Sequence, residues 1–277
     1  MIASVNKTKI YYEVKGEGTP LIFIPGLGAT HTMYKPQVDF FSKEYKTIVL
    51  DLRGTGKSGE LNVPIKKGLE TQSKDVADLM NQLNIKKAVF IGVSYGGVLT
   101  QKFYSLFPEK VMGMVIVDSF THTHPKSIKE FFNKVNSYNI LAYYLPKKFL
   151  SKELRKYYEK RWGKLVGEEM GKIILEMRTW ETVKQRLEIN SIDYRHVLQN
   201  VNVPVLGIVG DHTKMGVKFM KSIIDEVPHG KLEIFEDSFD PSNLCKPELF
   251  NNTVNEFLVK NKLLYSNKQA TFRPHLN

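Results

Sequence analysis

The feature that most constrains the fold of this chain is the ten-residue stretch Val89-Phe-Ile-Gly-Val-Ser-Tyr-Gly-Gly-Val98. A short apolar run leads to Ser94 and a helix-like segment follows it, so the stretch predicts a strand, a tight turn and a helix. Such a sharp turn requires small residues two positions before and after its apex, and Gly92 and Gly96 occupy those positions. The turn would expose the Ser94 hydroxyl, as a nucleophile requires.

The remainder of the chain alternates predicted strands with predicted helices. Strands are expected at residues 2–5, 9–15, 21–24, 46–51, 88–93, 111–117, 203–209 and 231–235, and helices at about 33–42, 70–84, 95–107, 214–227 and 246–260. Strands and helices that alternate at short spacing predict an α/β fold with a mostly parallel, doubly wound sheet. Ligands bind such sheets at the carboxyl ends of the strands, where Ser94 is expected to lie.

Residues 121–195 interrupt this alternation. The segment is rich in aromatic residues and contains no strand-like run, so it predicts several helices. We expect one domain whose core comprises residues 1–120 and 196–265, with 121–195 as a helical insertion and 266–277 as a polar tail.

These patterns resemble the α/β-hydrolase family over about residues 8–260. The G-x-S-x-G spacing around Ser94 resembles the nucleophile elbow of that family, and the helical insertion resembles its cap. The resemblance implies transfer of an acyl group to water from an ester, thioester or lactone through Ser94. It also implies a small apolar or acyl substrate.

The stretch Pro25-Gly-Leu-Gly28 lies where this family has its oxyanion turn, with Pro25 in place of the usual His. The resemblance therefore implies that the backbone N–H groups of Leu27 and Tyr95 form an oxyanion hole. Backbone donors do not depend on the side chain that precedes them, so Pro25 is compatible with this role.

The other two members of the family's catalytic triad depart from its pattern. The slot of the acid falls at Thr213, with Asp211 two residues earlier, and the slot of the base falls at Asp240, where the family has a histidine. The motifs that accompany the base, Asn243-Leu244 and Lys246-Pro-Glu248, are in place.

Two interpretations follow from these departures. In the first, the triad is impaired, because a carboxylate with a pKa near 4 is a poor base for Ser94 unless burial raises that pKa. The protein is then a weak hydrolase, or an inactive protein that binds a small apolar ligand. In the second, the site is rearranged, with His212 as the base and Asp240 orienting it. Asp118, which follows the predicted strand 111–117, is another candidate acid.

Three further histidines, His31, His122 and His124, are expected near this face of the sheet. Each is expected to be an ordinary surface or pocket residue.

The stretch Asp51-Leu-Arg-Gly-Thr-Gly-Lys-Ser58 ends like a phosphate-binding loop. A Walker A loop needs a glycine where Asp51 stands, whereas the stretch matches a structural loop of the α/β-hydrolase family. We therefore expect no nucleotide, and no motif implies a metal or a flavin, so no cofactor is predicted.

The net charge of +11 raises the question of nucleic-acid binding. Residues 121–200 carry 16 Lys and Arg against 9 Asp and Glu, so most of the excess lies in this segment. The segment has no nucleic-acid-binding motif, and we expect a solvated basic surface and no nucleic-acid partner.

The single cysteine, Cys245, excludes an intrachain disulfide, and the N-terminus lacks the pattern of a signal peptide. No run approaches eighteen apolar residues. A cytoplasmic protein without a membrane span is expected, and the sequence predicts no oligomeric state.

Overall fold

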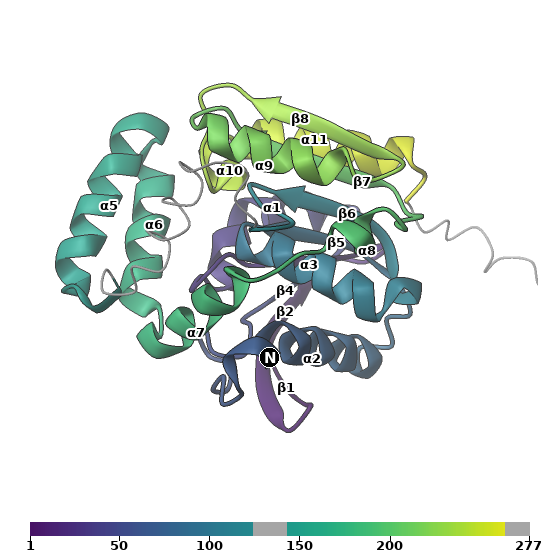
Figure 1. Cartoon of the computed structure of the whole chain (residues 1–277), viewed down its shortest axis with the longest axis horizontal. Helices are drawn as coiled ribbons and strands as arrows, with labels where there is room; N and C mark the ends of the chain where they lie inside the picture. Colours follow the sequence, from purple (N-terminus) through teal and green to yellow (C-terminus); the bar gives the residue numbers. More distant parts are fainter. Residues whose placement is uncertain (124–142, 264–277) are drawn as a thin grey trace, which may run out of the picture.

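The computed structural model describes residues 1–123 and 143–263. Its centre is an eight-stranded sheet with the strand order β1-β2-β4-β3-β5-β6-β7-β8 (Figure 1). The strands span Ile2–Val5 (β1), Thr8–Lys15 (β2), Pro20–Ile24 (β3), Lys46–Leu50 (β4), Ala88–Val93 (β5), Val111–Val117 (β6), Val205–Gly210 (β7) and Gly230–Phe235 (β8). β2 pairs antiparallel with β1 and β4, and the other neighbours are parallel. The prediction of a mostly parallel sheet is confirmed.

Helices cover both faces of this sheet (Figure 1). The helices are His31–Tyr34 (η1), Lys35–Phe41 (α1), Ile65–Lys67 (η2), Gly68–Gln82 (α2), Tyr95–Leu106 (α3), Pro108–Lys110 (η3), Lys147–Trp162 (α5), Lys164–Glu176 (α6), Thr179–Ile189 (α7), Arg195–Leu198 (α8), Lys214–Ile224 (α9), Ser242–Cys245 (α10) and Pro247–Lys260 (α11). Along β5, Phe90 belongs to the core cluster that contains α2 and α3, whereas Val89 and Ile91 belong to the cluster that contains α1 and α11. Successive side chains of a strand point to opposite faces, so both faces are buried and the doubly wound prediction is confirmed.

The parallel register brings the carboxyl ends of the central strands to one edge of the sheet. Ile24 at the end of β3 pairs with Gly92 of β5, and Val117 at the end of β6 pairs with Val93 of β5 and Ile208 of β7. The turns and loops that follow these strands therefore gather around the end of β5. This edge is where the candidate site lies.

The segment between β6 and β7 is helical where it is described, as predicted. It contains α5, α6 and α7. Its described residues form one isolated β-bridge, between His122 and Asp193. Figure 1 shows α5 and α6 side by side at the edge of the molecule, with α7 between them and the core. His124 and the tail at 266–277 lie outside the described residues.

The longest helices within residues 1–123 and 143–263 are α2 and α5. No helix in these ranges is long and apolar enough to cross a membrane.

Candidate active site

Ser94 lies at the apex of the turn between β5 and α3, with φ +53° and ψ −112°, a conformation that non-glycine residues rarely adopt. A β-carbon at Gly92 would lie 2.3 Å from the carbonyl oxygen of Gly96, and one at Gly96 would lie 2.1 Å from the carbonyl oxygen of Ile24. The two glycines therefore allow the close approach of backbone that the turn requires. Ser94 is also the single partly exposed residue between Ile91 and Thr100, so the turn presents it outward.

The turn after β3 lies beside Ser94, as an oxyanion hole requires. A β-carbon at Gly26 would be 3.8 Å from Cβ of Ser94. Within the described residues, the backbone N–H groups of Leu27 and Tyr95 donate to no protein acceptor. Two unpaired donors next to a serine can stabilise the negative oxygen of a tetrahedral intermediate.

Asp240, in the loop after β8, lies close enough to Ser94 for the serine side chain to lower the pKa of its carboxyl group. Burial raises the pKa of Asp240 to about 8, and the charge of Asp118 contributes to the same shift. Ser94 acts in the opposite direction and lowers this pKa, as a hydroxyl that donates to the carboxylate would. The hydroxyl of Tyr158, from α5, donates to the backbone oxygen of Asp240 at 2.5 Å. The helical insertion thus contacts Asp240, the residue that lies beside Ser94.

Asp118 follows β6 directly and accepts three hydrogen bonds. The donors are the N–H of Gly210 (3.0 Å), the N–H of Ser242 (2.6 Å) and the hydroxyl of Ser242 (2.9 Å). Burial raises the pKa of Asp118, and these donors act in the opposite direction. Because Asp118 accepts three hydrogen bonds, its carboxylate form is stabilised by more donors than that of Asp240. Asp118 also anchors Ser242, two residues after Asp240.

Thr213 and Asp211, the residues predicted for the acid of the triad, have contacts elsewhere. The hydroxyl of Thr213 accepts from the N–H of Gly216 (3.2 Å) and caps the start of α9. Asp211 is exposed, and its N–H bonds to the carbonyl of Phe235. Neither side chain has a hydrogen bond to Ser94 or Asp240, and the carboxyl beside Asp240 is Asp118.

The His212 ring contacts α5 and the loop after β8. The loops after β7 and β8 are neighbours, as expected, since the N–H of His212 donates to the carbonyl of Ser238. However, Nε2 of His212 lies 2.9 Å from the hydroxyl of Tyr157, and the ring packs against Trp162 and Phe239. These contacts hold the imidazole against α5 and do not bring it to Ser94 or Asp240.

His31 and His122 have contacts elsewhere. Nδ1 of His31 lies 2.7 Å from the carboxylate of Asp51, which also accepts from the N–H of Lys57. A β-carbon at Gly56 would lie 2.2 Å from the same carboxylate, so Asp51 fills the centre of this loop and leaves it no phosphate-binding cradle. His122 is buried, in the bridge to Asp193.

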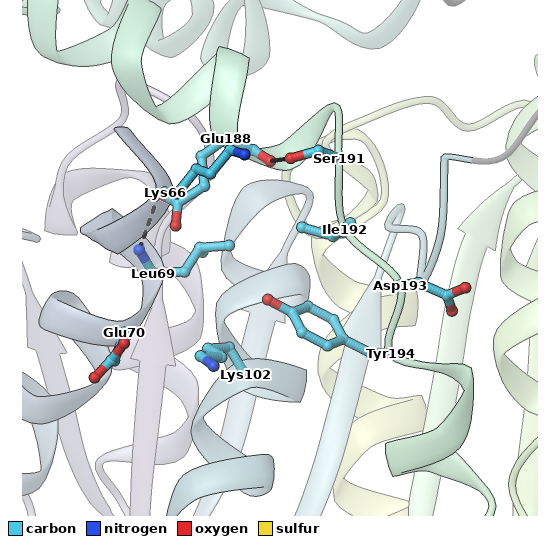
Figure 2. A pocket seen from close by; sticks show the side chains of 9 residues that line it. All are labelled: Lys66, Leu69, Glu70, Lys102, Glu188, Ser191, Ile192, Asp193 and Tyr194. Carbon is cyan, nitrogen blue, oxygen red and sulfur yellow. Dashed lines mark hydrogen bonds between the residues drawn. The ribbon is translucent and has the colours of Figure 1, made fainter. Parts of the chain in front are cut away.

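A separate pocket of about 280 Å³ lies between the start of α2 and the segment that follows α7 (Figure 2). Its lining residues are Lys66, Leu69, Glu70, Lys102, Glu188, Ser191, Ile192, Asp193 and Tyr194. The carboxylate of Glu188 accepts from the N–H of Leu69 at 3.0 Å, and burial raises the pKa of Glu188 to about 7. Glu188 thereby joins α7 to the core, and neither Ser94 nor Asp240 lines this pocket.

Sequence reasoning missed Gln185 on α7. The residue is 1% exposed, and neither atom of its amide has a hydrogen-bond partner in the described residues. One turn earlier, the hydroxyl of Thr182 is 3.3 Å from the place that a β-carbon of Gly28 would occupy, so this side of α7 lies toward the oxyanion turn. A buried amide without a partner is uncommon, which makes Gln185 a candidate for a role in this site. A glutamine within a helical pattern carries no signal for this, because most such residues face solvent.

Within the described residues, no group of three His, Cys, Asp or Glu side chains could hold a metal ion. The chemistry available at this edge of the sheet is that of a serine, two carboxyls and backbone donors.

Comparison with known proteins agrees with this architecture. The chain is similar to (E)-2-((N-methylformamido)methylene)succinate hydrolase of Acinetobacter baylyi, with 24% identity over 267 residues that cover 92% of this chain and 95% of that protein. It is 25% identical to 3-oxoadipate enol-lactonase 2 of the same bacterium over 243 residues, 84% of this chain and 86% of that protein. The solved structure of an esterase from Exiguobacterium antarcticum superimposes with a TM-score of 0.80 at 19% identity, covering 94% and 99% of the two chains.

The sequence model of the alpha/beta hydrolase fold matches residues 19–159, just over half of the chain. This range contains the oxyanion turn, the nucleophile elbow and Asp118. Together with the strand order and the elbow geometry, the match shows that the chain belongs to the alpha/beta hydrolase fold family.

Proposed function

We propose that this protein is a serine hydrolase of carboxylic esters, thioesters or lactones, with Ser94 as nucleophile and Asp240 as general base. The observation that carries the proposal is the position of the Asp240 carboxyl beside Ser94, together with the burial that raises the pKa of Asp240 to about 8. Relatives named as an enol-lactonase and an esterase support a substrate with an activated acyl group.

The reaction begins when Oγ of Ser94 attacks the acyl carbon and its proton passes to the carboxylate of Asp240. The carbonyl oxygen becomes negative and is stabilised by the N–H groups of Leu27 and Tyr95. Asp240 then gives its proton to the leaving alkoxide or thiolate, and the acyl group remains on Ser94. In the second half of the reaction, water attacks the acyl group on Ser94 and gives a proton to Asp240. Asp240 returns this proton to Oγ of Ser94 as the carboxylic acid departs.

A carboxylate can serve as this base because its surroundings raise its affinity for protons. A general base works best when its pKa lies near the working pH, and a pKa near 8 meets that condition where a pKa near 4 does not. Asp118 is a positioning residue in this scheme. Its bonds to Ser242 hold the loop of Asp240, and its charge makes Asp240 more basic.

The contacts of the helical insertion with the loop of Asp240 support a role of this insertion as a cap over the acyl pocket. Rings of Tyr158 and Trp162 from α5 stack on Phe239, the residue before Asp240, with centroids 6.0 and 5.9 Å away. These rings would keep the base out of water and offer an apolar wall to the acyl chain. We therefore propose the division into a core of residues 1–120 and 196–265 and a cap of residues 121–195.

The raised pKa of Asp240 also favours a second function, the binding of a small apolar ligand. Below pH 7 most Asp240 side chains are protonated, so Ser94 lacks a base and the protein would retain a small apolar ligand with little turnover. The two functions differ in the dependence of Ser94 reactivity on pH.

Labelling of Ser94 by a fluorophosphonate probe between pH 6 and pH 10 separates these functions. Because Asp240 acts in its ionised form, the rate should rise with pH, with a midpoint near 8, and level off above. Ser94→Ala should abolish labelling. Asp240→Asn should slow it about 100-fold or more and remove the pH dependence.

The matched control is Asp237→Asn, in the same loop, where the exposed carboxylate pairs with Arg161 at 2.9 Å. This variant should retain the wild-type rate and midpoint. A rate for Asp240→Asn equal to that of the wild type would contradict the assignment of the base. A rate that stays low up to pH 10 in the wild type would favour the ligand-binding function.

A further inference from the structure

Five large apolar side chains are exposed at one end of the helical insertion. They are Tyr144, Leu145, Phe149, Leu175 and Trp180, with exposed fractions between 48% and 59%. We call this group the tip patch. Single exposed apolar residues are ordinary on a protein surface, whereas a cluster of five indicates a binding surface.

The residues of the tip patch come from three helix ends that meet in space. The hydroxyl of Ser151 in α5 donates to the carbonyl of Gly171 in α6 at 2.8 Å, and a β-carbon at Gly167 would lie 2.7 Å from Cβ of Glu159. α5 and α6 are therefore antiparallel, and the start of α5 lies beside the end of α6. Nζ of Lys147 donates to the carbonyl of Met177 at 2.5 Å, which joins the start of α5 to the junction before α7. In Figure 1 these helix ends lie at the lower left.

Positive charge surrounds the tip patch. The first two turns of α5 carry three lysines, Lys147, Lys148 and Lys152, against one acid, Glu153. Lys148 and Lys152, in its first two turns, are exposed and have no ion pair within the described residues. Nζ of Lys184 lies 5.7 Å over the ring of Trp180. The acids near this end are Glu153, Glu176 and Glu181; Glu153 lies 3.7 Å from Lys156 and Glu181 lies 4.0 Å from Arg178.

We infer that the tip patch binds the surface of a lipid bilayer that carries anionic headgroups. Aromatic and aliphatic side chains that are exposed at the same end of the insertion, with lysines near them, allow shallow insertion below the headgroups while the ammonium groups contact lipid phosphates. The two leucines argue against nucleic acid, because aliphatic chains offer no stacking surface to a base. The excess of positive charge argues against a second copy of this chain, because two identical cationic patches repel each other.

This inference goes beyond the proposed hydrolase activity and does not depend on it. Ser94 lies at the carboxyl end of β5, whereas the tip patch lies at the start of α5 and the end of α6. Binding to a bilayer should therefore be the same in the Ser94→Ala variant.

Co-sedimentation of the full chain with vesicles tests the inference. The wild type should sediment with vesicles of phosphatidylcholine and phosphatidylglycerol at 3:1, and at least tenfold less with phosphatidylcholine alone or at high salt. The double variant Leu145→Glu/Phe149→Glu should weaken binding at least tenfold. Lys148→Glu/Lys152→Glu should weaken binding to the anionic vesicles by a similar factor.

The matched control is Leu165→Glu, because Leu165 is 50% exposed on the same insertion but at the opposite end of α6. This variant should bind like the wild type, and all variants should retain the wild-type melting temperature. Equal loss in Leu165→Glu, or no sedimentation of the wild type, would overturn the inference. A dimer that Leu145→Glu/Phe149→Glu converts to a monomer would also overturn it, by assigning the tip patch to self-association.

Discussion

The turn that presents Ser94, the proposed nucleophile, lies beside the loop that presents Asp240, the proposed base, but different forces hold the turn and the loop in place. The nucleophile turn is fixed by backbone contacts, with carbonyl oxygens packed where the β-carbons of Gly92 and Gly96 would be. The base loop is fixed by side chains, since Asp118 holds Ser242 and Tyr158 holds the carbonyl of Asp240.

Because of this difference, substitutions in the two regions should have different consequences. A change in the nucleophile turn should alter folding first, because nothing can replace the close backbone contacts. A change in the base loop should alter the pH at which Ser94 reacts, because the acidity of Asp240 depends on burial and on a neighbouring charge. The four predictions below test this separation.

The largest effect is expected in the nucleophile turn. Gly96→Ala places a β-carbon 2.1 Å from the carbonyl oxygen of Ile24 and 2.9 Å from that of Pro25. We expect a loss of about 4 kcal/mol or more in the free energy of unfolding, since backbone cannot move aside cheaply. Thermal unfolding measures this loss. Gly26→Ala is the control, because its β-carbon meets ordinary contacts at 3.6 and 3.8 Å, and an equal loss there would contradict the argument.

In the base loop, Asp240→His should raise hydrolysis of a p-nitrophenyl ester at pH 7 by about tenfold, because an imidazole with a pKa near 6.5 is largely unprotonated there. The midpoint of the pH profile should move from near 8 to near 6.5. Adding Thr213→Asp should give no further gain, since the carboxyl beside position 240 is Asp118. A further gain in the double variant would show that the loop after β7 reaches the base.

Asp118→Asn should shift the pH profile toward acid. The charge of Asp118 raises the pKa of Asp240, so its removal lowers that pKa and moves the midpoint down by about one unit. Labelling by fluorophosphonate as a function of pH measures the midpoint. An unchanged midpoint would mean that burial alone makes Asp240 basic.

The smallest effect is expected at Thr213. Thr213→Ala removes the cap of α9 and should cost about 1 kcal/mol in the free energy of unfolding, with kcat unchanged. Thr213→Ser keeps a capping hydroxyl and should behave like the wild type. A fall in kcat for the alanine variant that exceeds its fall in folded fraction would restore Thr213 to the catalytic site.

Much of the fold could be predicted from the sequence because its signals are local. The central strands β3, β4, β5, β6 and β7 are short apolar runs, and the helices that follow show their own periodicity. The elbow was predictable for the same reason, since the need for Gly92 and Gly96 arises within a few residues of Ser94. Predictions for residues 124–142 concern a part of the chain outside the described residues.

The partners of Ser94 were less predictable because they are far apart in the chain. Asp118 follows an apolar strand, and the order Ser94, Asp118, Asp240 is the order in which this fold family arranges its triad, so the sequence held a signal for it. No local pattern could show that the ring of His212 packs against α5, because Tyr157 and Trp162 lie about fifty residues away in the chain.

By itself the sequence determined that this chain forms a mostly parallel sheet, with a serine on a tight turn at the carboxyl end of its central strand. Apolar periodicity and glycine positions are sufficient for that, because they act over short stretches of backbone. The tertiary structure alone decided that a carboxyl group with a pKa near 8 contacts this serine. That value depends on burial by the loop and the insertion and on a charge from another strand, and these come together when the sheet is assembled.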